Sequence, residues 1–336
     1  MLGIDQSTQG TKGIVFDGDG KIVARTDLPH DQIINEKGWV EHDPSQIMKN
    51  VIQVVKNAVE KAGIDKKDIL GLGISNQRET AVCLNKRTGE PVYNAIVWQC
   101  ARGESICKEI AADGHAAMIQ EHTGIPLSPY YSAAKIAWVL RNVEEAGRAA
   151  EQGELAVGTM DSYLLYHLTK EHVFKTDYSN ASRTQMFNIR TLDWDDEVNA
   201  LFGIKREMLA EICDSDALYG YTDFDGWLDE PIPIHGVMGD SHGALYGQGC
   251  LKPGMIKATY GTGSSIMMNV GEKPIYSDKG VVSSLAWSLK GKVNYVLEGN
   301  INYTGAVITW LRDIRVQHGA VITSAFGAGT FVRSLN

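Results

Sequence analysis

Leu2-Gly-Ile-Asp-Gln-Ser-Thr-Gln-Gly-Thr-Lys-Gly-Ile-Val-Phe-Asp17 predicts two short strands joined by a turn of small and hydroxylic residues. Such a turn exposes backbone N–H groups and hydroxyls, which suit phosphate oxygens and a hydrated metal ion. The later stretch Lys257-Ala-Thr-Tyr-Gly-Thr-Gly-Ser-Ser-Ile-Met-Met268 repeats this strand, turn and strand pattern. The repeated hairpin indicates two related domains that face a nucleotide between them.

A third stretch places an aspartate directly after an apolar strand: Ile234-His-Gly-Val-Met-Gly-Asp-Ser-His-Gly-Ala-Leu-Tyr-Gly247. Active-site residues of α/β proteins gather at strand ends of this kind. The Asp240 carboxylate can accept the proton of an attacking hydroxyl in phosphoryl transfer, or it can simply cap the predicted helix that follows. Asp5, which ends the first strand, can hold a hydrated Mg²⁺ or cap a turn through its own backbone.

Other candidate site residues also follow predicted strands. Arg78 and Glu79 come after the apolar strand Ile69–Ser75. Adjacent opposite charges can bind vicinal hydroxyls, since arginine donates and glutamate accepts, or they can form a purely structural ion pair. Trp98 can pack on the C–H face of a sugar or belong to the core. Tyr130, after a proline, can line a pocket or be an ordinary loop residue.

Two residues of the hairpin turns are candidates for binding phosphate. Lys12 can neutralise phosphate charge, although an isolated lysine is usually a solvated surface residue. Thr262, in Tyr260-Gly-Thr-Gly263, can donate to a β- or γ-phosphate, or it can belong to a plain glycine-rich turn. The match between this hairpin and the N-terminal one favours the nucleotide.

The composition excludes several classes of protein. A length of 336 residues allows two domains, and 43% hydrophobic with 22% charged residues is typical of a globular chain. The formal charge of −9 argues against a nucleic-acid partner. Neither a Walker A sequence nor a Gly-x-Gly-x-x-Gly after a strand occurs, which argues against a P-loop or a Rossmann site. His-Glu-x-x-His and clustered Cys/His are absent, which argues against zinc.

The expected location is the cytoplasm. The five cysteines form no C-x-x-C pair, as in a reduced cytosolic protein. The N-terminus lacks a basic segment and Asp5 interrupts any apolar one, so we expect no signal peptide. No apolar run is long enough to span a bilayer, so we expect no membrane partner.

The order of predicted elements indicates an α/β fold. Asp43-Pro-Ser-Gln46 predicts the start of a helix. Asp43 caps this helix, Gln46 completes a capping box, and Gly63 ends the helix. Further helices are predicted near 101–112, 132–146, 159–168, 194–202 and 302–313. Strands are predicted at Leu2–Asp5, Gly13–Asp17, Lys21–Asp27, Ile69–Ser75, Thr80–Asn85, Ala95–Trp98, 232–239, 255–260, 264–269, 281–288 and 293–298. The predicted domains are 1–250 and 251–336, because the repeated hairpin begins just after Gly254.

The chain resembles the FGGY carbohydrate kinases of the actin/hexokinase/Hsp70 superfamily, and among them the glycerol kinases, from residue 2 to about 313. The motifs that carry this resemblance are Gly38-Trp-Val-Glu-His-Asp-Pro44, Ser75-Asn-Gln-Arg-Glu-Thr80, Tyr93-Asn-Ala-Ile-Val-Trp-Gln-Cys100, Thr176-Asp-Tyr-Ser-Asn-Ala-Ser-Arg-Thr184 and Thr191-Leu-Asp-Trp-Asp195. The resemblance implies an actin/hexokinase/Hsp70-like (ribonuclease H-like) two-domain α/β fold. Family members extend well beyond this C-terminus, so the second domain is expected to be incomplete.

The resemblance also implies an activity, which is phosphoryl transfer from MgATP to a hydroxyl of glycerol or a related small polyol or ketose. Asp240 matches the family's general base and Asp5 its metal-side aspartate. The implied phosphate-binding residues are Ser7, Thr8, Gln9, Lys12, Gly261, Thr262 and Gly263. The implied substrate-binding residues are Arg78, Glu79, Trp98, Tyr130, Asp240, Ser241 and Ser265. Homo-oligomers are common in the family, so one is possible here.

Three positions depart from the glycerol kinases. Lys12 stands where they have Arg, which keeps the charge but loses the bidentate fork. Ser241 replaces a usual Gln and Ser265 a usual Phe, so the pocket is expected to admit a longer polyol or a ketose. The shorter length leaves an alternative, a catalytically inactive, truncated sugar-binding remnant. An actin- or Hsp70-like assembly module is disfavoured, because Arg78, Glu79 and Trp98 have no use there.

Overall fold

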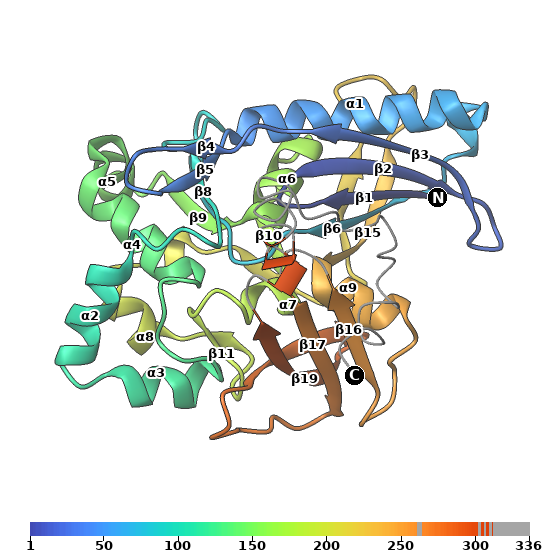
Figure 1. Ribbon diagram of the computed structural model, residues 1–336. Coiled ribbons are helices and arrows are strands. Elements are labelled where there is room, and N and C mark those ends of the chain that lie inside the picture. The colour runs from blue at the N-terminus through green and yellow to red at the C-terminus, as the bar shows by residue number, and fades with distance from the viewer. Residues whose placement is uncertain (261–263, 302–303, 306, 309–310, 312–336) are drawn as a thin grey trace.

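A computed structural model of the chain describes residues 1–260, 264–301, 304–305, 307–308 and 311. Its largest sheet has six strands in the order β14-β15-β6-β1-β2-β3 (Figure 1). These strands are β1 (Leu2–Gln6), β2 (Gly10–Phe16), β3 (Ile22–Pro29), β6 (Leu72–Asn76), β14 (Leu218–Thr222) and β15 (Ile232–Gly239). The sheet confirms the predicted α/β class and the predicted N-terminal hairpins.

The middle of this sheet explains where a site can form. Strand β6 runs parallel to both β1 and β15, with Gln6 and Gly239 both paired to Asn76. The three strands therefore end at one edge of the sheet. Since α9 (Asp240–Gly247) begins directly after β15, Asp240 lies at this edge with the residues that follow β1 and β6.

Helix α1 (Pro44–Ala62) lies along β2 and β3 (Figure 1) and buries its apolar stripe against them. The Asp43 side chain accepts from the backbone N–H of Ser45, and Gly63 ends the helix in the left-handed conformation, as predicted. The predicted capping box is wrong. Gln46 instead exchanges two hydrogen bonds with Asp31, which draws its amide away from the helix start.

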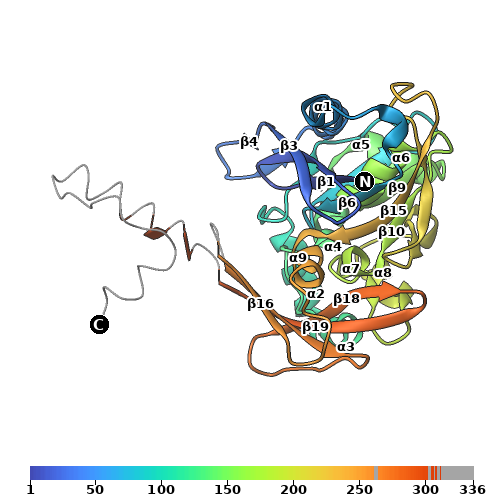
Figure 2. The same ribbon diagram turned by 90° about the vertical axis from the view of Figure 1, so that its right-hand side faces the viewer.

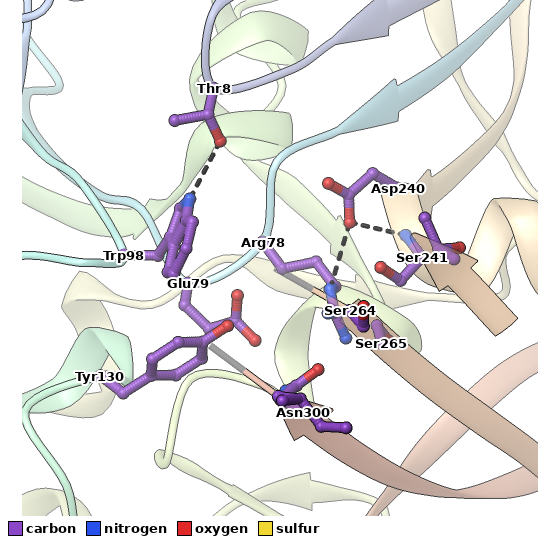
Figure 3. Close-up of a pocket in the computed structure, with 12 residues that line it drawn as sticks. Thr8, Arg78, Glu79, Trp98, Tyr130, Asp240, Ser241, Ser264, Ser265 and Asn300 are labelled. Atoms are coloured by element: carbon purple, nitrogen blue, oxygen red, sulfur yellow. Dashed lines mark hydrogen bonds and ion pairs between the residues drawn. The ribbon is translucent and has the colours of Figure 1, made fainter. Parts of the chain in front are cut away.

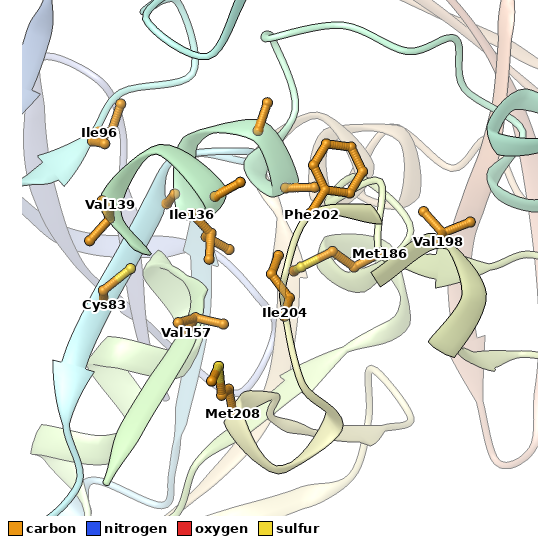
Figure 4. Close-up of a cluster of buried hydrophobic side chains, with 14 of the residues drawn as sticks. Cys83, Ile96, Ile136, Val139, Val157, Met186, Val198, Phe202, Ile204 and Met208 are labelled. Carbon is orange, nitrogen blue, oxygen red and sulfur yellow. The ribbon is translucent and has the colours of Figure 1, made fainter. Parts of the chain in front are cut away.

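A second sheet of five strands, in the order β4-β5-β8-β7-β9, packs against α4, α5 and α6, while α2 packs on α4 and α3 on β11 (Phe187–Asn188). Its strands are β4 (Ile33–Ile34), β5 (Val40–His42), β7 (Ala81–Asn85), β8 (Ala95–Ile96) and β9 (Leu155–Thr159). The helices are α2 (Glu104–Ala112), α3 (Ala116–Thr123), α4 (Ser132–Asn142), α5 (Glu144–Glu151) and α6 (Met160–Leu168). Apolar residues of the sheet, of α4 and of the segment 186–208 form one core (Figure 4).

The helices of this region differ from the prediction in two places. The helix predicted at 132–146 is divided, because Val143 adopts an extended conformation between α4 and α5. Helix α3 was not predicted. Strand β6 begins at Leu72 rather than Ile69. Ile69 instead caps the end of a 3₁₀ turn, η1 (Lys66–Asp68).

A third sheet, in the order β16-β17-β19-β18, holds the repeated hairpin. Its strands are β16 (Ile256–Tyr260), β17 (Ser264–Gly271), β18 (Val282–Leu289) and β19 (Lys292–Ile301), all close to prediction. Figure 2 shows α7 (Tyr178–Ala181) and α9 between this sheet and the six-stranded one. The turn 261–263, and with it Gly261, Thr262 and Gly263, lies outside the described residues, as does most of the helix predicted at 302–313.

The remaining elements connect these layers. They are β10 (Lys175–Asp177), β11 (Phe187–Asn188), β12 (Asp193–Trp194), α8 (Asp196–Leu201), η2 (Arg206–Met208) and β13 (Glu211–Cys213). The division proposed at 250/251 falls between α9 and β16 and stays a prediction. Within the described part of the chain, no helix combines the length and the apolar character needed to cross a bilayer.

Candidate active site

A cavity of about 190 Å³ opens where β1, β6 and β15 end, and it faces the third sheet (Figure 3). All seven residues proposed for the substrate line it, together with Thr8 from the first hairpin. The full lining is Thr8, Arg78, Glu79, Trp98, Tyr130, Asp240, Ser241, Thr259, Ser264, Ser265, Asn300 and Ile301. Residues far apart in the sequence thus meet because parallel strands end at one edge.

Asp240 points its carboxylate toward the cavity from the first position of α9. Oδ1 accepts from the N–H of Ser241 (2.6 Å) and lies 3.2 Å from Nε of Arg78. Oδ2 has no partner among the described residues, and the side chain is 39% exposed. One carboxylate oxygen is therefore held in place, and the other is left to accept a proton from a bound hydroxyl.

The turn before Asp240 is fixed by a buried polar group. The N–H of Gly239 donates to Oγ of Ser179, and that hydroxyl donates to Asp177. Asp177 also accepts from the hydroxyl of Ser215, and burial raises the pKa of its carboxyl. These bonds set the direction in which the chain enters α9, and hence the position of the Asp240 carboxylate.

Arg78 and Glu79 belong to a buried network of four charges. Arg78 makes two parallel hydrogen bonds of 2.9 Å to Glu298. Arg183 lies 2.6 Å from Glu79 and 3.1 Å from Glu298. Burial alone would raise the pKa of Glu298, but Arg183 and Arg78 hold it well below its usual value. The network joins the loop after β6 to β19.

The aromatic wall of the cavity is made by Trp98 and Tyr130, whose ring centroids lie 5.5 Å apart (Figure 3). Nε1 of Trp98 donates to the hydroxyl of Thr8 (2.9 Å). Glu79 lies between these two rings and Arg78 (Figure 3). Its backbone φ is 58°, a strained conformation for a residue with a side chain. Two flat apolar faces therefore border the Arg78 and Glu79 pair.

Of the phosphate and metal residues proposed in the first hairpin, Thr8 lines this cavity. Nζ of Lys12 pairs with Asp5 at 2.6 Å, since the two residues are cross-strand partners in β1 and β2. Both remain about 30% exposed. Ser7 donates to the carbonyl of Gly10 with both its backbone N–H and its hydroxyl. The backbone N–H of His30 donates to the carbonyl of Gln9. A cation bound by Asp5 would displace Lys12 from it, and a phosphate bound by Lys12 would displace Asp5.

Over the described part of the chain, no three His, Cys, Asp or Glu side chains gather to enclose a metal ion. Mg²⁺ usually keeps several waters and needs only one or two carboxylates besides phosphate oxygens. The partly exposed carboxylate of Asp5 fits that requirement.

Several residues at the site were missed from the sequence, above all Arg183 and Glu298. Glu298 follows Val296 by two residues and so shares its inward face of β19, where a carboxylate needs a partner. Arg183 lies in the polar run 176–184 quoted above. The other cavity residues not predicted are Thr259, Ser264, Asn300 and Ile301. No local pattern distinguishes these from ordinary strand residues.

Two histidines support the first hairpin from behind. Nε2 of His30 lies 3.0 Å from the carbonyl of Thr8, and its ring meets His42 edge-on. His42 is fully buried beside Gln77, and burial lowers its pKa to about 3.

We expect His42 to make the fold less stable in mild acid. Its folded-state pKa lies below the unfolded value of about 6.5, so the unfolded chain takes up the proton first. The stability given by neutral His42 is therefore full above pH 6.5 and is lost as the pH falls toward 3. At pH 5 the loss is about 2 kcal/mol.

Urea unfolding at pH 7.5 and 5 tests this expectation. His42→Asn should lose about 2 kcal/mol less than the unaltered chain between these pH values. His235→Asn, at an exposed position, is the matched control. Equal pH dependence in the unaltered chain and His42→Asn would contradict the assignment.

Comparison with known proteins gives the family context of this site. Residues 1–247 match the N-terminal domain of the FGGY family of carbohydrate kinases. Glycerol kinase 1 of Thermotoga maritima is 51% identical over 313 residues, which cover 93% of this chain and 63% of the relative. Glycerol kinase of Alkaliphilus oremlandii is 47% identical over 93% of this chain and 62% of its own. The chain therefore spans a little under two thirds of the length of these relatives.

Solved structures agree. The crystal structure of Plasmodium falciparum glycerol kinase with ADP superposes with a TM-score of 0.88 at 35% identity, covering 94% of this chain and 63% of that one. The ligand-bound xylulose kinase of Lactobacillus acidophilus has a TM-score of 0.82 at 24% identity, covering 93% and 61%, which shows the fold alone. The predicted actin/hexokinase/Hsp70-like fold is confirmed, with the second domain present in part.

Proposed function

The chain belongs to the FGGY family of carbohydrate kinases, and we propose that it transfers the γ-phosphoryl group of ATP to a hydroxyl of glycerol or a related small polyol or ketose. The observation that carries this proposal is that the open oxygen of Asp240 faces the same cavity as Arg78 and Glu79. Glycerol kinase 1 of Thermotoga maritima is 51% identical to this chain. The similar glycerol kinase of Plasmodium falciparum was solved with ADP.

In the proposed mechanism the first domain binds and orients the polyol. Arg78 donates to its hydroxyls and Glu79 accepts from them, while Trp98 and Tyr130 cover the carbon chain. Asp240 then accepts the proton of the attacking hydroxyl as the oxygen approaches the phosphoryl group in line. The aromatic wall keeps water from that side, which limits hydrolysis of ATP.

The phosphate side is proposed from the first hairpin and the turn 261–263. Ser7, Thr8, Gln9, Lys12, Gly261, Thr262 and Gly263 would contact the phosphates through N–H groups, hydroxyls and one ammonium. Asp5 would hold Mg²⁺ through water, and the ion would offset negative charge on the transferred group. The five cysteines are all unpaired, which supports the proposed cytoplasmic setting. A homo-oligomer stays a prediction.

The lining of the cavity supports a substrate with more hydroxyls than glycerol. Ser241 and Ser265 both border it, and the hydroxyl of Ser265 donates to Glu298 at 3.0 Å. An apolar substrate group against these serines would be disfavoured, because a hydroxyl buried without a partner is unfavourable. A substrate hydroxyl at this wall could pair with them. A four- or five-carbon polyol or ketose would reach them.

The deciding experiment measures ADP release from MgATP with glycerol, erythritol, xylitol, ribulose and xylulose, alongside calorimetric binding of each compound. Turnover with at least one compound is the expected result. Binding without turnover by any of the five would replace the kinase by a sugar-binding remnant. Neither binding nor turnover from folded protein would overturn the proposed substrate class.

A further inference from the structure

A fully buried lysine lies behind the aromatic wall of the cavity. Nζ of Lys135, on α4, donates to three consecutive carbonyls, those of Pro129 (2.7 Å), Tyr130 (2.5 Å) and Tyr131 (3.1 Å). An ammonium group has three N–H donors and no acceptor, so these carbonyls satisfy it completely. Among the described residues no carboxylate forms an ion pair with it.

The surroundings make this charge expensive to keep. Burial lowers the pKa of Lys135 to about 7. The charged and titratable groups that face it are Glu79 after β6, Cys100 and Arg102 after β8, and Cys107 on α2. Of these, Glu79 favours the ammonium most and Arg102 opposes it. A methionine would fill the same space without this penalty, so packing alone does not explain a lysine here.

The segment that Lys135 holds carries one wall of the cavity. The Tyr130 ring lies against Trp98, and the Tyr131 ring lies 5.2 Å from the guanidinium of Arg183. The hydroxyl of Ser132 donates to the carbonyl of Glu79 at 3.1 Å. Residues 129–132 therefore contact the wall and the buried charges together, and a shift of this segment would move both.

We propose that Lys135 is a positioning residue of the cavity, whose ammonium group fixes the Tyr130 ring by gathering the carbonyls of residues 129–131. The inference rests on the proposed function only in its last step, that this wall covers a bound polyol. The group itself does not touch the substrate. Its effect passes through the backbone of the segment.

The first test reads the wall without any ligand. The full chain is labelled with 3-fluorotyrosine, and the Tyr130 resonance is assigned through Tyr130→Phe. Lys135→Met should shift or broaden that resonance and leave the resonance of Tyr163, which is buried in a different core, unchanged. Lys108→Met, the same change at a side chain that is 74% exposed, should alter neither. Should Lys135→Met fail to fold, Lys135→Gln, with two N–H donors, carries the test.

The second test separates positioning from general stability. Lys135→Met should weaken glycerol binding about tenfold, the equivalent of about one charge-assisted hydrogen bond, and leave the KM for ATP unchanged. An unchanged Tyr130 resonance in folded Lys135→Met overturns the proposal. Equal losses for glycerol and ATP also overturn it, since they indicate general damage. If glycerol does not bind the unaltered chain, the best-bound compound of the panel takes its place in this test; if none of the five binds, the proposed substrate class fails, while the Tyr130 resonance still decides the role of Lys135.

Discussion

Asp240→Asn is expected to lower the turnover of phosphoryl transfer by about 10²–10⁴-fold, the usual contribution of a general base. The amide keeps the oxygen that accepts from Ser241, so the side chain should stay in place. It replaces the open carboxylate oxygen by an NH₂ group, which cannot accept a proton. Polyol binding should change only a few-fold, because Arg78 and Glu79 remain. A fall in kcat with little change in KM is therefore the signature.

The measurement is ADP release with the best substrate of the panel, beside calorimetry of the same substrate. Asp278→Asn makes the same chemical change at a side chain that is 83% exposed and should leave both readings unchanged. Full activity in Asp240→Asn would place the base elsewhere. A complete loss of polyol binding would instead indicate that Asp240 mainly holds Arg78 in place.

Local signals in the sequence were enough to predict most elements of the fold. The hairpin strands, α1 with its Asp43 cap and β15 all lie close to their predicted bounds, because each has a period and a terminating residue. The division of the predicted helix at Val143 could not be predicted, since Val143 is no helix breaker by itself. Helices α4 and α5 pack against each other on either side of it.

The candidate site was predictable on one side only. Arg78, Glu79 and Asp240 each follow a strand, so their chemistry and their placement were visible in the sequence. Glu298 lies 220 residues from Arg78 and meets it only because the third sheet packs over α7 and α9. No local pattern encodes such a contact. By contrast, the pairing of Asp5 with Lys12 follows from the hairpin register and could have been derived.

Arg183→Met is expected to destabilise the fold by about 3–5 kcal/mol, as found when one partner of a buried ion pair is removed. Arg183 is fully buried and is the only residue that pairs with the Glu79 carboxylate in the described part of the chain. Glu298 keeps its two bonds to Arg78, so the unpaired charge falls on Glu79. Urea unfolding at pH 7.5 measures the loss. Arg190→Met, which breaks an exposed pair with Glu121, should lose less than about 1 kcal/mol.

The double variant Arg183→Met/Glu79→Gln separates the two sources of that loss. If the loss comes mainly from an unpaired buried carboxylate, replacing Glu79 by a neutral amide should recover part of it, and the double variant will be more stable than Arg183→Met alone. If the loss comes from the packing of the guanidinium against Tyr131, the second change will add its own destabilisation. Recovery would mean that Glu79 is charged in the folded protein. A charged Glu79 would accept from a polyol at the wall of the cavity more strongly than a neutral carboxyl group does.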